Sequence, residues 1–156
     1  MVSKLEKRIA EDAYFSYVYA REVLEAPFPQ GEDAIAKDGI RSMLYAKEVL
    51  EAPFPQGEDA IARGLSTSFI YAERVLKGPF PEGEPILATH PVSSFRYAYE
   101  VIEGPFAEGE KAIAKSARFS FKYAFKVLKD RFPEGEFMME REGGELWETY
   151  SLFYLD

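Results

Sequence analysis

Apolar and polar positions recur along this chain with a period of 26 residues. The stretch YAREVLEAPFPQGEDAIA at 19–36 returns at 45–62 with one change, Arg21 to Lys47. Looser copies begin at three further tyrosines, Tyr71, Tyr97 and Tyr123. A repeat of this length is typical of a solenoid, in which each short repeat buries its apolar face against its neighbours.

Repeat positions 1 to 26 are counted here from each repeat tyrosine. The whole chain, 1–156, is then predicted to form a single solenoid domain. Its parts are a partial leading repeat at 1–18, full repeats at 19–44, 45–70, 71–96, 97–122 and 123–148, and a C-terminal cap at 149–156. In this register Thr149 stands at the tyrosine position and Trp147 at the aromatic position 25.

Each repeat is predicted to hold one long and one very short helix, which gives an all-α repeat solenoid. The long helix runs from about position 21 to position 7 of the next repeat, because Phe69, Ala72 and Leu76 follow helical spacing. The short helix follows an FPEGE-type turn and has one or two turns, 3₁₀ in some repeats. A phenylalanine at position 10 and an aliphatic residue at position 17 are the expected core of this second half.

Both ends of the long helix carry boundary signals. Gly78 and Gly104 at position 8 fit a left-handed C-terminal cap, and the prolines at position 9 prevent continuation. Pro91 suits a first helical position. Position 20 offers side chains that can accept hydrogen bonds from the amides of the first turn, namely Asp12, Asp38 and Ser116.

The repeat resembles short tandem repeats with a YAxxVLxxxFPEGE core in uncharacterised proteins of tailed phages and environmental genomes. One copy carries the resemblance in Tyr71, Ala72, Val75, Leu76, Phe80, Pro81, Glu82, Gly83 and Glu84. The resemblance implies a helical repeat and a viral origin, and therefore the host cytoplasm as location. It implies no activity and assigns no functional residue.

Composition and charge narrow the function classes. The formal net charge is −8, whereas a phosphate-binding surface needs clustered Lys and Arg, so no direct nucleic-acid partner is expected. The absence of cysteine excludes disulfides and thiolate metal sites. No run is long enough to span a bilayer and the N-terminus lacks a signal-peptide core, so a cytoplasmic protein without a membrane partner is expected.

Three polar columns recur with the repeat. The glutamates of position 14 are interpreted as bonding free amides at the start of the short helix; the alternative is an acidic track for cations or a basic peptide. The tyrosines are interpreted as core residues whose hydroxyls reach a carbonyl or carboxylate, rather than as a ligand groove. The serines of position 24 are interpreted as small spacers. The columns begin at Glu6, Tyr19 and Ser16.

Catalytic signatures are missing from the sequence. His90 is the only histidine and occupies a helix-capping position. No nucleophile-elbow sequence or phosphate-binding glycine loop occurs. We therefore expect no enzyme, no cofactor and no metal site.

Two repeat positions vary along the chain in a way that suggests a binding stripe. Positions 26 and 3 are aliphatic or charged in the early repeats, and basic or aromatic in the late ones. Burial against the neighbouring short helix is the alternative. The candidate binding residues are Leu44, Ile70, Arg96, Tyr99, Lys122 and Phe125.

The function predicted from these features is a non-catalytic module that binds or scaffolds another protein, a host protein if the origin is viral. One alternative is an acidic mimic of nucleic acid, and another is a small-ligand protein that sequesters a nucleotide through tyrosines and Arg96. The apolar C-terminal stretch GGELWETYSLFYLD is predicted to seal the last repeat and to form a homodimer contact.

Overall fold

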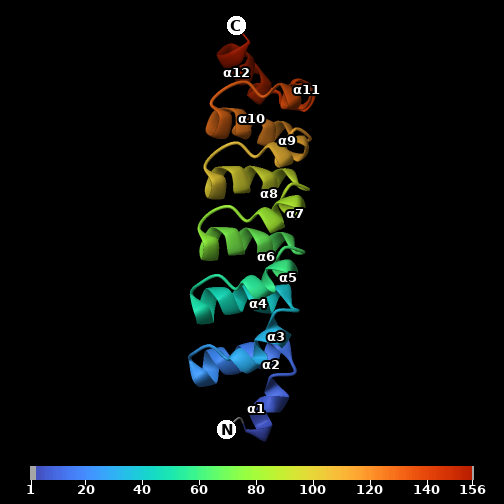
Figure 1. The fold of residues 1–156 in the computed structure, drawn as a ribbon. Helices are drawn as coiled ribbons and strands as arrows, with labels where there is room; N and C mark the ends of the chain where they lie inside the picture. The colour runs from blue at the N-terminus through green and yellow to red at the C-terminus, as the bar shows by residue number, and fades with distance from the viewer. Residues whose placement is uncertain (1–2, 156) are drawn as a thin grey trace. The chain divides into compact units, whose positions relative to one another are not determined.

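The computed structural model describes residues 3–155, which form helices and connecting turns without any strand. It comprises two compact units, Met1–Ile86 and Leu87–Asp156, and each is described by itself. Within each unit long and short helical elements alternate in chain order (Figure 1). The prediction of an all-α repeat fold with alternating long and very short helices is therefore confirmed, while the prediction of one domain stays a prediction.

The first unit opens with the short helix α1 (Lys4–Ile9). Its long helices begin as α2 (Ala13–Val18), α4 (Gly39–Tyr45) and α6 (Leu65–Ile70). Each continues without a break as a π-helical segment: Tyr19–Leu24, Ala46–Leu50 and Tyr71–Leu76. The short elements are 3₁₀ turns at Pro29–Gly31, Pro55–Gly57 and Pro81–Gly83, which lead into α3 (Glu32–Ile35), α5 (Glu58–Ile61) and α7 (Glu84–Leu87).

The second unit repeats this order. Its long helices are α8 (Pro91–Arg96) with the π-helical Tyr97–Ile102, and α10 (Ala117–Tyr123) with the π-helical Ala124–Leu128. The intervening short helices are α9 (Ala107–Ile113) and α11 (Pro133–Glu142). The described part of the chain closes with α12 (Glu145–Tyr154).

The predicted helix starts are confirmed by the capping side chains. Asp12 accepts a hydrogen bond from the Phe15 amide at 2.9 Å, and Asp38 accepts one from the Arg41 amide at 2.9 Å. Ser116 plays the same role at the start of α10. These bonds satisfy amides that have no partner within the first helical turn.

The predicted helix ends are wrong by one residue. The left-handed residue is at position 7, never glycine: Lys77 and Glu103 have φ values of 52° and 55°. Gly78 and Gly104 follow them and donate their amides to Ala72 and Ala98, six residues back. The residue that follows the left-handed position donates the amide that closes the last turn. The left-handed position therefore falls on the residue before the glycine, and the glycine supplies this amide.

Repeat tyrosines join each repeat to the preceding one. The Tyr45 hydroxyl accepts a hydrogen bond from the Phe28 amide at 2.9 Å and donates one to Glu32 at 2.8 Å. The tyrosine is thus a core residue whose hydroxyl reaches a carboxylate, as predicted. The same two bonds are made by Tyr71 with Phe54 and Glu58, and by Tyr123 with Phe106 and Glu110.

The glutamates at position 14 make structural hydrogen bonds in these repeats, but the predicted donor, a free amide of the short helix, is wrong. The Glu32 amide at the start of α3 is bonded to the Pro29 carbonyl, and the preceding Gly31 amide to the Phe28 carbonyl. The 3₁₀ turn has therefore used the amides that the carboxylate was expected to bind, and the tyrosine of the next repeat supplies the donor instead. Glu6 is the exception, since it accepts bonds from both the Ser3 amide and the Tyr19 hydroxyl.

The serine of position 24 is the predicted small spacer and also a hydrogen-bond donor. Ser42 is fully buried, and its hydroxyl donates to the Ile35 carbonyl at the end of α3. A Cβ built on Gly57 would lie 2.5 Å from the Ser42 Oγ, so only glycine fits beside this serine. The phenylalanines of position 10 and the aliphatic residues of position 17 are buried as predicted, among them Phe28, Phe54, Phe80, Ile35, Ile61 and Ile113.

The C-terminal register differs from the prediction by one residue. Tyr150, not Thr149, takes the tyrosine position, because its hydroxyl accepts from the Phe132 amide at 2.8 Å and donates to Glu136 at 2.8 Å. α11 runs on to Glu142, and Gly144 with φ 50° turns the chain into α12. This longer link adds one residue to the last repeat. Trp147 therefore does not stand at position 25 and instead stacks on the Tyr150 ring.

Candidate protein-binding surface

Chemistry-bearing groups elsewhere in the molecule offer little for catalysis. His90 is exposed at the start of α8, and its Nδ1 lies 2.7 Å from the Thr89 hydroxyl. Among residues 3–155, no three acidic or histidine side chains are arranged to hold a metal ion. None of the helices in that range has the length and apolar composition that a membrane span requires. The expectation that the chain is not an enzyme stays a prediction.

In the first unit, basic side chains at position 3 are tied to acidic neighbours. Arg21 donates to the Tyr17 hydroxyl at 3.0 Å and lies 3.4 Å from Glu48, which also accepts from Tyr17 at 2.6 Å. Burial and the Glu48 bond raise the pKa of Tyr17, and the Tyr17 hydroxyl lowers the pKa of Glu48. Lys47 pairs with the same carboxylate. This cluster stabilises the packing between repeats and leaves no unpaired cation there.

The two candidate residues of the first unit are aliphatic and half-buried. Leu44 and Ile70 each precede a buried tyrosine, Tyr45 and Tyr71, on their long helices. Their partial burial agrees with the alternative that position 26 packs against neighbouring elements. These two residues offer a small apolar surface and no polar group that could orient a ligand.

In the second unit, side chains at the variable positions pack around stacked aromatic rings. The Phe95 and Tyr99 rings stack with centroids 5.7 Å apart and planes 8° apart, and Phe119 lies 5.7 Å from Phe95. Phe95 is buried, whereas 44% of Tyr99 is exposed. Since Phe95 and Phe119 come from α8 and α10, the rings connect two neighbouring long helices.

Two lysines lie over these rings. The Lys122 ammonium is 5.9 Å from the Phe95 centroid and 5.6 Å from that of Phe119. The Lys126 ammonium is 5.5 Å from the Tyr99 centroid. Neither lysine forms an ion pair within the described residues. The ring faces attract the ammonium groups without neutralising them, so both positive charges stay available.

Aromatic contacts continue to the last helix. Phe125, half-buried, lies 4.4 Å from Phe121, 5.3 Å from Phe153 and 5.0 Å from Tyr154, measured between ring centroids. Phe153 on α12 is 70% exposed. We name six exposed or half-buried residues of these two groups of rings and lysines the aromatic–lysine surface: Tyr99, Phe119, Lys122, Phe125, Lys126 and Phe153.

Arg96 lies at the margin of this surface and is already engaged. Its guanidinium donates to both carboxylate oxygens of Glu100, one turn along, with a closest distance of 2.7 Å. The pair is partly exposed, so its contribution to stability is small. Arg96 therefore presents a neutralised pair rather than a free charge.

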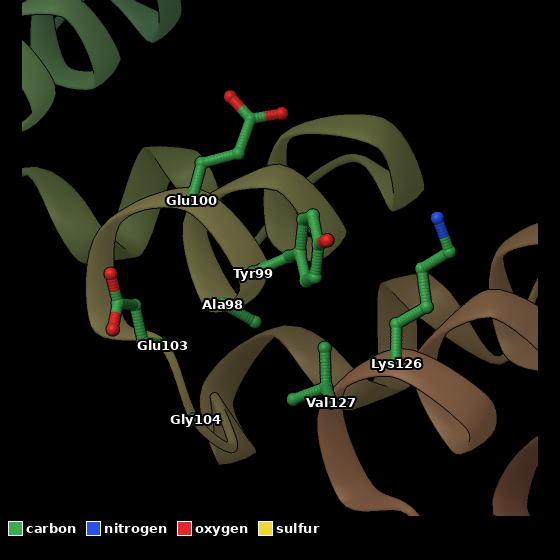
Figure 2. A pocket seen from close by; sticks show the side chains of 7 residues that line it. All are labelled: Ala98, Tyr99, Glu100, Glu103, Gly104, Lys126 and Val127. Carbon is green, nitrogen blue, oxygen red and sulfur yellow. The ribbon is translucent and has the colours of Figure 1, made fainter.

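A shallow hollow of about 480 Å³ lies beside Tyr99. Figure 2 shows Tyr99 and Lys126 projecting from neighbouring helices over a floor that contains Ala98 and Val127. Glu100 and Glu103 lie on the Tyr99 side of it. The hollow is open and would not enclose a small molecule, so it suits a side chain of a partner protein better.

Sequence reasoning found only part of this group. Tyr99 and Lys122 were predicted as binding residues and lie in the first group of rings, with Arg96 at its margin; Phe125, also predicted, lies in the second group. Lys126, Phe119 and Phe153 were missed. Position 4 is glutamate at Glu22, Glu48 and Glu100 but basic at Arg74 and Lys126, and this variation is the signal that could have found Lys126.

Comparison with known proteins gives no relative for this chain: no protein-family model matches it, and neither the curated proteins nor the solved structures contain a match.

Proposed function

We propose that this chain is a non-catalytic helical-repeat module that binds another protein through the aromatic–lysine surface. The observation that carries the proposal is the placement of Lys122 and Lys126 over aromatic rings, with no carboxylate paired to either. Exposed aromatic side chains are enriched where proteins recognise one another, and unpaired cations beside them can pair with acidic groups of a partner. Repeat folds commonly present such surfaces on successive helices.

Affinity capture from a cell lysate tests this proposal. The bait carries Lys122→Glu and Lys126→Glu, and its matched control carries Lys111→Glu and Lys115→Glu, two exposed lysines of α9 and its following turn. Both baits change the net charge equally. We expect captured proteins to be lost with the first bait and kept with the control. An identical set of captured proteins from both baits and the unaltered chain would refute the proposal.

The viral origin and the cytoplasmic location belong to the same proposal and are supported only by the resemblance of the repeat. Fractionation of bacterial cells that produce the chain tests the location. Recovery in the membrane or periplasmic fraction would contradict it.

Self-association through the C-terminal end is a second proposal, supported by exposed apolar side chains on α12. Leu152 is 71% exposed, Phe153 70% and Leu155 40%. Light scattering across a concentration series tests it, with Leu152→Ser as the variant expected to abolish dimers. A monomer at every concentration would exclude the dimer.

The other functions considered from the sequence have no supporting observation. Acidic mimicry of nucleic acid requires one continuous negative face, but Glu22, Glu48 and Glu73 alternate with the paired Arg21, Lys47 and Arg74. A nucleotide in the hollow beside Tyr99 would meet the Glu103 carboxylate, which repels phosphate.

A further inference from the structure

We infer that the aromatic–lysine surface recognises an acidic, amphipathic segment of its protein partner, and this inference rests on the proposed function. The first step is charge. Arg118, Lys122 and Lys126 contact ring faces and form no ion pair within the described residues. This local excess of positive charge stands out in a chain with a net charge of −8, and it is complementary to carboxylates.

The second step is spacing. Lys122 and Lys126 are four residues apart on one continuous helix, α10 and its π-helical extension, so their Cβ atoms lie about one turn, ~6 Å, apart. A partner helix with carboxylates at i and i+4 offers the same separation. The two lysines therefore match a repeated pair of carboxylates better than a single anion.

The third step is the apolar component. The Tyr99 ring lies under the Lys126 ammonium, and the hollow beside Tyr99 has room for an apolar side chain above Ala98 and Val127. An amphipathic helix presents apolar residues next to its acidic ones at the same i, i+4 spacing. A helical segment with acidic and apolar residues side by side at this spacing would make both kinds of contact.

Nucleic acid fits this surface less well. Glu103 lines the Tyr99 side of the hollow, where it would repel a continuous phosphate backbone. A peptide can place its carboxylates selectively over the lysines and its apolar groups toward the glutamate side. We therefore assign the surface to an acidic peptide segment.

Fluorescence anisotropy with three defined probes tests the assignment. The first is a labelled helical peptide of about 15 residues with glutamates at i and i+4 and leucines beside them. The second is its counterpart with glutamine in place of glutamate, and the third is a single-stranded oligothymidine. The proteins are the unaltered chain, Lys122→Glu/Lys126→Glu, and the matched control Lys111→Glu/Lys115→Glu. Circular dichroism verifies that all three are folded.

We expect the acidic peptide to bind at least about tenfold more tightly than the glutamine peptide, and to lose that advantage only in Lys122→Glu/Lys126→Glu. Its binding should also weaken as salt rises. Equal binding of both peptides, lost in Tyr99→Ala, would overturn the acidic assignment and leave the proposed protein-binding function standing. Oligothymidine binding through the two lysines would overturn both. Failure of every probe to bind would overturn this inference alone, and the lysate capture then decides the function.

Discussion

The Tyr71 hydroxyl accepts a hydrogen bond from the Phe54 amide at 2.9 Å, although Phe54 lies in the turn of the preceding repeat, 17 positions earlier. The same hydroxyl donates to Glu58 at 2.7 Å. One oxygen thus satisfies two groups of the turn and short helix that precede it. Tyr71 is fully buried and Phe54 nearly so, which means that water does not replace this oxygen when it is removed.

Tyr71→Phe should therefore destabilise the chain by about 1–3 kcal/mol, because the buried Phe54 amide loses its partner. Urea unfolding followed by circular dichroism measures the change. Tyr14→Phe is the matched control, since the Tyr14 side chain is half exposed, and it should change stability little. Equal effects of the two substitutions would show that the cross-repeat bond contributes nothing.

Gly57→Ala should destabilise by about 1–3 kcal/mol through overpacking. Its Cβ would approach the Ser42 Oγ to 2.5 Å and the Phe54 ring to 2.7 Å. Gly78→Ala is the control, because a Cβ there meets nothing nearer than 3.9 Å. Adding Ser42→Gly to Gly57→Ala should restore part of the loss in thermal unfolding. If Gly57→Ala and Gly78→Ala melt alike, the contact with Ser42 is not tight.

Glu51→Gly should be more stable than Glu51→Ala by about 1 kcal/mol, because the backbone at this residue has φ 48° and a side chain disfavours that conformation. Comparing the two variants removes the effect of the lost carboxylate. Thermal unfolding measures the difference. A more stable alanine variant would mean that the helix end rearranges.

Alkaline pH should unfold the chain through its buried tyrosines. Burial is the main cause that raises the pKa of Tyr150 to about 12, and it also raises the pKa of Tyr45, Tyr71 and Tyr123. A tyrosine in the unfolded chain ionises near its ordinary pKa of about 10. The unfolded state therefore loses protons first, and the stability present below about pH 10 declines as pH rises towards 12.

Melting temperatures between pH 8 and 12, recorded with phenolate absorbance, test this. The drop in melting temperature should coincide with ionisation of the buried tyrosines. Ionisation of all tyrosines near pH 10 with an unchanged melting temperature would contradict the buried hydroxyl bonds.

Truncation after Gly144 should lower the melting temperature by several degrees or more. It removes Tyr150, which is fully buried, and leaves the Phe132 amide and Glu136 without their partner. It also removes the Trp147 and Tyr154 rings that pack on Tyr150. Phe137→Ser, at a position 66% exposed on α11, is the control and should melt like the unaltered chain. An unchanged melting temperature after truncation would refute the cap.

Much of the fold was predictable because the pattern is repeated. Residues such as Ile35, Phe54 and Ala72 recur in the same apolar context, and each recurrence adds evidence for the same buried position. The partner of Glu32 could not be read from the sequence. A short helix that begins with a 3₁₀ turn uses its own amides, and that turn depends on the packing of Phe28.

The last repeat and the candidate surface were harder to predict for a different reason. One added residue near Gly143 and Gly144 moves Tyr150 into the tyrosine position. An alignment of the repeats without gaps does not reveal this insertion. On the surface, Arg96 and Lys126 look alike as basic residues in variable positions. Only the three-dimensional arrangement shows that Arg96 is paired with Glu100 whereas Lys126 lies over Tyr99.

The bond from each tyrosine to the preceding repeat also bears on how such a chain can change in length. Within the first unit, Tyr45 and Tyr71 make the same two bonds to repeats that are nearly identical in sequence. Each of these junctions contains its own donor and acceptors, so a duplicated or deleted 26-residue segment meets a neighbour that already fits it. Unequal exchange between such segments in the gene can therefore lengthen or shorten the array without any new packing having to evolve.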